Sequence, residues 1–358
     1  MVALLGKKDV PTDGVEDYCR FLSPAMGARG YVVEIVRVPW EELGWIRAWM
    51  RLWRESREWK GKWVLLQYTA LMWSRRGFPL AFLVVLLTLK VRRARLVTVF
   101  HDAAPYFGKR MADRVRGACQ RWVLRRAYGW TRASVLPVPM EEISWLARPA
   151  AKTRFIPVGP NIPTIARVDR APRSGNEPKT IAVFGITDGG DISQEVLAIT
   201  QAAAAASQHV RQVRLVTLGR GSRESEPDFR SALAGSSVEY QALGILSAEE
   251  VSRVLADCDV ALFVRGRITT QRGSAMAVIA SGTPLVAYGE PDAASHLIEA
   301  GIVLVPLGDQ KELAKSVVRV LTDEALESEL RRRNQRAHAT FFSWEAIAEQ
   351  LGTVLDNG

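Results

Sequence analysis

Basic and small residues gather in one short segment of this sequence and could together bind an anion. Arg265 and Arg272 lie in the segment 265–273, which holds a third arginine and no acid, and Gly273 and Ser274 form its end. The segment joins an apolar run to an alanine-rich stretch, which predicts a strand before the loop and a helix after it. Free N–H groups at the start of a helix favour a phosphate. The alternative is an ordinary βαβ unit with a solvated basic loop.

Other residues with chemical potential follow other apolar runs. Gly185 and Gly189 lie in a glycine loop after an expected strand at 180–185, and Arg220 lies in the LGRGS segment after a strand at 214–219. In the first half, His101 and Asp102 come directly after a strand at 95–100. Ligand groups of open α/β sheets sit at such carboxyl ends.

The pattern of apolar runs determines how these residues would be positioned. Runs of four to eight residues, rich in Val, Ile and Leu, alternate with helical patterns along both halves of the 358-residue chain. This alternation predicts parallel, doubly wound sheets. The length favours two domains. We expect an N-terminal domain at 1–166, a charged linker at 167–178, a second domain at 179–341, and a final helix at 342–358 that packs back on the first domain.

Charge and hydropathy bear on partners. The net charge is +10 with a pI of about 9.8, which favours anionic partners. Residues 109–132 carry eight basic side chains and one acid on an expected helix. Residues 78–89 form a twelve-residue apolar stretch, too short for the roughly 20 residues that a bilayer requires. Such a stretch is either a buried helix or an interfacial segment with a basic flank.

Several classes of site can be set aside. The sequence has no GxxxxGK[ST], HExxH, CxxC or GxSxG motif, and its one GxG lacks the third glycine of a dinucleotide fingerprint. The three cysteines are far apart, which indicates a reducing, cytosolic setting. The five-residue apolar start is too short for a signal peptide. Two Rossmann-like halves with glycine and basic loops therefore outline a nucleotide-diphosphate site without a bound metal.

Over nearly its whole length the sequence resembles the family-4-like (group 1) glycosyltransferases of GT-B fold. In the first half the similarity rests on a first strand followed by GVE, on the strand ending at His101, and on IPVGPNIP. In the second half it rests on VFG, LGRGS, LSAEEVSRVLADCDVALF and VIASGTPLVAY, which resembles the family's EAMAxGxPVVA segment. The FSW before the last helix is also similar to the family's tail.

The resemblance implies two Rossmann-like domains facing across a cleft, and transfer of a sugar from a UDP- or GDP-linked donor to a saccharide or glycolipid. Retention of anomeric configuration is usual in the family. His101 would be catalytic, with Gly14 and Asp102 on the acceptor side. The donor would be held by Gly185, Gly189, Arg220, Arg265, Arg272, Gly273 and Ser274. No cofactor, metal or nucleic acid is expected. We expect a cytoplasmic protein of polysaccharide biosynthesis, with contact to the inner face of an anionic membrane.

One departure from the family pattern concerns the donor loop. The family carries two glutamates eight positions apart, and the corresponding positions here are Thr269 and Ala277. The lysine that the family places after the first strand of this domain is also missing. A degenerate GT-B protein, a basic module for lipid or nucleic acid, and another GT-B-like enzyme such as an epimerase or phosphorylase are the alternatives.

Overall fold

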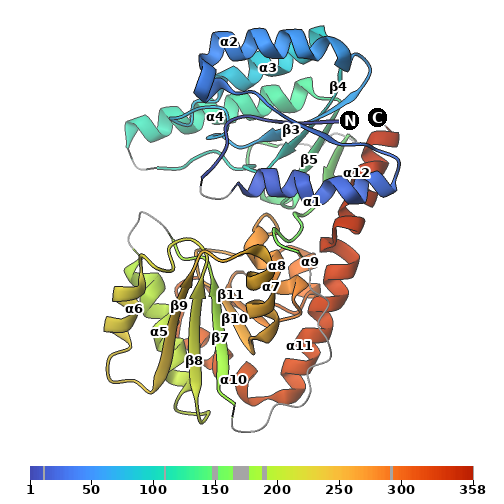
Figure 1. Cartoon of the computed structure of the whole chain (residues 1–358). Helices are drawn as coiled ribbons and strands as arrows, with labels where there is room; N and C mark the ends of the chain where they lie inside the picture. The colour runs from blue at the N-terminus through green and yellow to red at the C-terminus, as the bar shows by residue number, and fades with distance from the viewer. Residues whose placement is uncertain are drawn as a thin grey trace. The chain divides into compact units, whose positions relative to one another are not determined.

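The computed structural model of the chain describes residues 1–10, 13–108, 110–146, 152–163, 177–187, 192–290 and 293–357. They form two compact units (Figure 1). Unit 1 comprises Met1–Val158 together with Trp344–Gly358, and unit 2 comprises Gly159–Ser343. Residues 159–163, expected in the first domain, therefore lie in unit 2, where Ser252 Oγ donates a hydrogen bond to the carbonyl oxygen of Pro163 at 2.6 Å. Most of the expected linker, residues 167–176, is outside the described residues.

Unit 1 contains a parallel six-stranded sheet in the order β2-β1-β3-β4-β5-β6. Its strands are β1 (Val2–Leu5), β2 (Glu34–Arg37), β3 (Trp63–Tyr68), β4 (Arg95–Phe100), β5 (Ala133–Leu136) and β6 (Thr153–Phe155). Its helices are α1 (Gly14–Ala28), α2 (Trp40–Glu55), η1 (Ser56–Trp59), α3 (Leu80–Val91), α4 (Met111–Trp130), η2 (Met140–Glu142) and α12 (Trp344–Asp356). Helices α2, α3 and α4 cover one face of the sheet, and α1 and α12 cover the other (Figure 1).

The C-terminal helix belongs to unit 1. Helix α12 packs along α1, and the Tyr31 hydroxyl donates a hydrogen bond to Asp356 Oδ1 at 2.5 Å. The Trp344 ring lies edge-on to the ring of Tyr18, with centroids 5.3 Å apart. The last helix is thus held by both apolar and polar contacts.

Unit 2 contains a second parallel sheet in the order β12-β11-β10-β7-β8-β9. Its strands are β7 (Lys179–Phe184), β8 (Val213–Leu218), β9 (Val238–Gly244), β10 (Val260–Phe263), β11 (Leu285–Tyr288) and β12 (Val303–Val305). Its helices are α5 (Ser193–Ala206), α6 (Glu226–Ala232), α7 (Ala248–Asp257), α8 (Gly273–Ala280), α9 (Ser295–Glu299), α10 (Gln310–Thr322), α11 (Glu324–Ala337) and the π-helical turn η3 (His338–Phe342). Helix α10 packs against α5 over a core that includes Ile199 and Val317.

The apolar patterns explain why these elements form. The parallel strands are buried on both faces, so they read as continuous apolar runs. Helix ends follow capping rules: Asp13 Oδ1 accepts from the N–H groups of Val15 and Glu16, and Ser247 with Glu250 forms a capping box. In the described part of the chain no helix is long and apolar enough to cross a membrane.

Two expectations about unit 1 are corrected. Trp45, Trp49 and Trp53 recur every four residues, which predicts a core-facing stripe, yet the buried positions of α2 are Trp40, Ala48 and Leu52. Helix α2 is kinked at Gly44, and Trp49 lies at the seam with α3, 39% exposed. Helix α3 is likewise not buried all round, because only its inward face enters the core.

Candidate active site

The sheet of unit 2 has a point where successive crossovers change direction. From β7 the chain continues to β8 and β9 on one side, whereas β10, β11 and β12 are added on the other, so β7 and β10 are direct neighbours. Ligands of open α/β sheets bind outside the carboxyl ends of the strands at such a point. The residues directly after these two strands include Gly185 and Arg265.

Arg265 reaches across this switch point to Gly185 and Ser274. A side chain at Gly185 would place its Cβ 3.3 Å from Arg265 Nη1, and Gly185 has a φ of +81°, which favours glycine. The Nη2 group of Arg265 donates a hydrogen bond to Ser274 Oγ at 3.2 Å. Burial lowers the pKa of Arg265, the charge of Glu195 opposes that effect, and Arg272 adds to it. The site is a partly buried cation with incomplete compensation, as an anion site requires.

The LGRGS segment packs beneath this cation. The Gly185 N–H donates to Leu218 O at 2.7 Å, and the Ile186 N–H donates to Arg220 O at 2.9 Å. A Cβ at Gly221 would be 2.7 Å from Ile186 O, so the second glycine permits this close approach. Arg220 itself is partly buried at the adjacent strand end. The glycines of this motif therefore shape the loop after β7.

Helix α8 starts beside Arg265 with its first N–H groups uncapped by a side chain. Arg272 is the N-cap residue, is exposed, and makes no side-chain capping bond. Gly273 and Ser274 are the first two helical residues, and a Cβ at Gly273 would lie 3.3 Å from the Cβ of Asn161. Arg267, the other arginine of the loop, is instead paired with Glu290 at 2.9 Å. The structure thus brings Arg265, Gly273 and Ser274 together and assigns Arg267 to another contact.

Three polar side chains around this cation were missed by the sequence analysis. Glu195 is 92% buried, its Oε2 accepts from the Thr187 N–H at 3.2 Å, and its Oε1 has no hydrogen-bond partner among the described residues. The buried Asn161 Oδ1 and Thr269 Oγ1 also lack partners within the described residues. An acid in the first turn of the alanine-rich helix after a glycine loop was the available signal for Glu195. Gly189 is outside the described residues.

The two positions where the family pattern carries carboxylates differ strongly in surroundings. Thr269 is partly exposed in the loop, whereas Ala277 is buried inside α8, 1% exposed. A carboxylate at position 277 would enter an apolar environment and would be costly without a partner. The loop of this chain is therefore built around its arginines.

In unit 1, His101 sits at the carboxyl end of β4 on an ordered partner. Its Nε2 is 2.7 Å from Gln67 Oε1, and Gln67 Nε2 donates to Leu65 O at 3.4 Å. This orientation makes Gln67 Oε1 the acceptor, so the histidine Nε2 carries the proton and Nδ1 presents a lone pair. Burial lowers the pKa of His101 to about 4, against an opposing effect of Asp13. The ring of Tyr18 packs edge-on, with centroids 4.9 Å apart.

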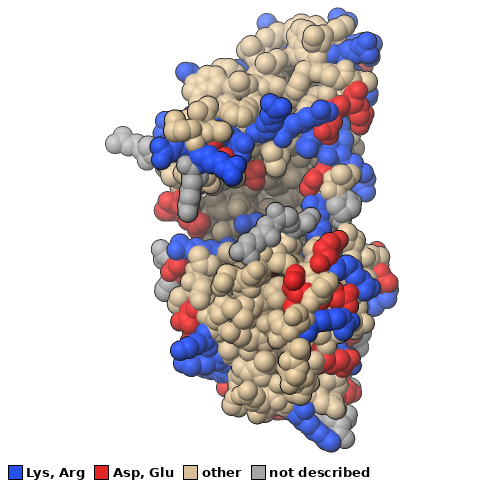
Figure 2. Space-filling view, turned by 90° about the vertical axis from the view of Figure 1, so that its left-hand side faces the viewer, with Lys and Arg blue, Asp and Glu red and all other residues tan. Residues whose placement is uncertain are grey.

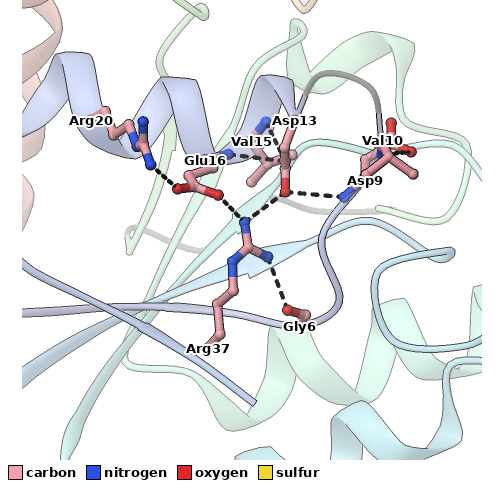
Figure 3. A network of polar contacts seen from close by, with 8 residues as sticks. All are labelled: Gly6, Asp9, Val10, Asp13, Val15, Glu16, Arg20 and Arg37. Atoms are coloured by element: carbon pink, nitrogen blue, oxygen red, sulfur yellow. Dashed lines mark hydrogen bonds and ion pairs between the residues drawn. The ribbon is translucent and has the colours of Figure 1, made fainter. Parts of the chain in front are cut away.

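An ion-pair network holds the loop that follows β1. Arg37 donates to Asp13 Oδ2 at 2.7 Å, to Gly6 O at 3.1 Å, and to Glu16 (Figure 3). Burial alone raises the pKa of Asp13, but the Glu16 N–H and the Arg37 guanidinium outweigh it and hold the pKa below its ordinary value. This network orients the start of α1, electrostatically close to His101.

The other two acceptor-side candidates lie in the same unit. Gly14 is the exposed first residue of α1, and a Cβ placed on it would have no atom within 4 Å. Asp102 follows His101, and its Oδ2 accepts from the Ala70 N–H at 3.1 Å, which braces the turn after β3. Asp102 therefore has a structural contact. Among the described residues, no group of three or more His, Cys, Asp or Glu side chains could hold a metal ion.

Comparisons with known proteins agree with this architecture. Residues 190–323 match the sequence model of the family described as glycosyl transferases group 1. No curated protein matches the chain in sequence. Three solved structures match nearly all of it. HepE from Anabaena, in complex with UDP and glucose, has a TM-score of 0.68 at 15% identity, covering 100% of both chains.

The second is sucrose-phosphate synthase from Thermosynechococcus elongatus, with a TM-score of 0.66 at 18% identity, covering 99% of this chain and 98% of that protein. The third is a glycosyltransferase from Rickettsia africae, with a TM-score of 0.67 at 12% identity, covering 100% and 99%. At these identities the structures establish the fold. The predicted α/β class with two doubly wound parallel sheets is confirmed, and so is the resemblance to group 1 glycosyltransferases. The chain has the GT-B fold, and its residues 190–323 belong to the glycosyl transferases group 1, a family of transferase enzymes.

Proposed function

We propose that this protein transfers a sugar from a nucleotide-diphosphate sugar to a saccharide or lipid-linked acceptor. The observation that carries the proposal is the meeting of Arg265, Gly185 and Ser274 at the switch point of unit 2, within a glycosyltransferase family segment. The structure of HepE, which this fold resembles, was determined in complex with UDP and with UDP-glucose. We infer that the donor is UDP-linked or GDP-linked.

The donor diphosphate would bind where positive charge and N–H groups converge. Arg265 supplies charge-assisted hydrogen bonds, Arg220 and Arg272 add positive charge, and the N–H groups of Gly273 and Ser274 face the same anion. Gly185 and Gly189 allow the backbone to approach it closely. As the glycosidic bond to the sugar breaks, negative charge develops on the leaving diphosphate. Donors held in place before the reaction stabilise that charge, and this requires no bound metal.

His101 would act on the sugar side of the reaction. At pH 7 its lowered pKa keeps the ring neutral, so Nδ1 accepts a hydrogen bond from a hydroxyl of the donor sugar or acceptor. The bond to Gln67 fixes the ring and its tautomer. Gly14 and Asp102 belong to the acceptor side in this proposal, with retention of anomeric configuration as in the family.

The setting of the reaction follows from charge and composition. We propose a cytoplasmic enzyme of polysaccharide biosynthesis that contacts the inner face of an anionic membrane, with no nucleic acid partner. The net charge of +10 and the basic helix α4 support an anionic surface.

A donor screen tests the proposal. At about 100 times its Kd, a true donor nucleotide stabilises the folded state by about 2.7 kcal/mol, which raises Tm by several degrees. UDP, GDP, ADP and CMP would be compared by thermal shift, followed by product analysis with the sugar donor of the stabilising base. Release of the sugar to an acceptor or to water supports transfer, and an interconverted nucleotide sugar indicates an epimerase. No stabilisation by any nucleotide, with no turnover, contradicts the proposal.

A further inference from the structure

Helix α3 presents an apolar stripe to solvent. Leu80, Val84, Leu87 and Val91 recur at intervals of four, three and four, and each is between 50% and 58% exposed. This spacing places them on one face, about 16 Å long at 1.5 Å per residue. The opposite face, with Phe82, Leu86 and Leu89, is buried against the sheet. Because α3 is apolar all round, packing on the sheet accounts for only half of its apolar surface.

The flanking helices extend this stripe into a broader surface. On one side α2 contacts α3 through a hydrogen bond from Trp49 Nε1 to Thr88 Oγ1 at 2.9 Å, and it exposes Ile46 and Met50 by more than half. On the other side α4 packs against α3, and Lys90 Nζ lies 5.8 Å from the ring centre of Trp130. Helix α4 exposes Met111, Val115 and Trp122.

Basic side chains surround this α2–α3–α4 surface. Residues 39–132 hold 20 of the 48 lysines and arginines and only 6 of the 38 acids, a net charge of +14. The whole chain carries +10, so the remainder is net negative. Figure 2 shows part of this arrangement, a wide uncharged area in the upper unit above a row of Lys and Arg. Exposed examples are Arg47, Arg54, Arg93, Arg114, Arg121 and Arg126.

We propose that the α2–α3–α4 surface docks onto an anionic lipid bilayer. The α3 stripe and its neighbours would enter the boundary between headgroups and acyl chains, and the arginines would pair with lipid phosphates. Exposed Trp49 and Trp122 suit this boundary, where tryptophan is enriched. A second copy of the chain fits poorly, since it would bring two faces of net charge +14 together. The surface locates the membrane contact of the proposed function and rests on that function only for a lipid-linked acceptor.

Co-sedimentation with vesicles tests the docking. The full chain is expected to bind phosphatidylcholine vesicles enriched in phosphatidylglycerol, and to bind pure phosphatidylcholine much more weakly. The double variant Val84→Gln, Leu87→Gln should lower the partition coefficient at least tenfold, since two half-exposed aliphatic side chains no longer enter the bilayer. Gln is a better helix former than Val, so α3 should persist. Ile245→Gln, at a similarly exposed apolar position in unit 2, is the matched control and should not change binding.

The basic component has its own pair of variants. Replacing Arg47, Arg114 and Arg121 by Gln should weaken binding to the anionic vesicles about 100-fold, at roughly 1 kcal/mol for each charge. A charge-matched triple of exposed residues in unit 2, replacing Arg253, Lys311 and Arg336 by Gln, should change it far less.

Three results would overturn the docking: no binding to anionic vesicles, equal loss with both sets of variants, or a dimer in analytical ultracentrifugation that the α3 double variant abolishes. Vesicle binding without turnover of any nucleotide sugar would instead refute the proposed function and leave the docking intact.

Discussion

The three arginines of the donor loop allow a sharp test, because two of them have opposite surroundings. Arg265 faces Gly185 and donates to Ser274, whereas Arg267 is an exposed partner of Glu290. Arg265→Gln removes a charge-assisted donor from the proposed diphosphate site. Losing one donor that stabilises developing negative charge costs about 2.7–4 kcal/mol, so kcat/KM for the sugar donor should fall about 100- to 1000-fold.

Stability should respond in a different way. Arg265→Gln loses one hydrogen bond, worth about 1 kcal/mol, but it also relieves the burial that lowers the pKa of Arg265. The midpoint of thermal unfolding should therefore stay close to that of the wild type. Arg267→Gln loses an exposed ion pair worth about 0–1 kcal/mol and should leave kcat/KM almost unchanged.

The assays are initial rates over a range of donor concentrations, UDP affinity by calorimetry, and thermal unfolding of each variant. A UDP affinity of Arg265→Gln within threefold of the wild type would refute the role of this side chain. An equal loss for Arg267→Gln would show that the loop acts only through its net charge.

Other residues give further tests. Gly185→Ala should destabilise unit 2 by about 1–2 kcal/mol in chemical denaturation because of its positive φ, and should weaken donor binding by displacing Arg265, whereas Gly14→Ala meets no atom and should do neither. His101 has a folded-state pKa of about 4, below its unfolded value, so its contribution to stability is complete above about pH 6.5 and is lost as pH falls toward 4. His101→Gln should flatten the pH dependence of unfolding in that window and reduce kcat; an unchanged slope would contradict the assignment. Glu195→Ala should raise KM for the donor, because Thr187 loses its acceptor; normal KM with lowered stability would leave Glu195 a purely structural role.

The strand–loop–helix–strand unit around the donor loop was readable from the sequence. The apolar runs predicted at 260–264 and 285–288 are β10 and β11, and the alanine-rich segment is α8. Parallel strands buried on both faces must be continuously apolar, and helix starts must satisfy free N–H groups, so both leave local marks. The same argument explains why Ser247 and Glu250 were recognised as a capping box.

The roles within that loop were not readable, because Arg265, Arg267 and Arg272 are equivalent by composition. Their neighbours come from distant parts of the chain: Gly185 lies 80 residues before Arg265 and becomes its neighbour through the pairing of β7 with β10. Glu195 and Asn161 approach the same region for the same reason, and no local pattern marks them. Membership of a site thus depended on strand order.

By itself the sequence determined the alternation of strands and helices, their approximate bounds and the excess of positive charge in its first half, because each depends on nearby residues and on composition. Only the tertiary structure decided which arginine lies over the glycine loop, which nitrogen of His101 is free, and which side of α3 faces outward. Helix α3 is apolar on every side, so its sequence carries no direction. Only its packing on the sheet separates a buried face from the exposed one.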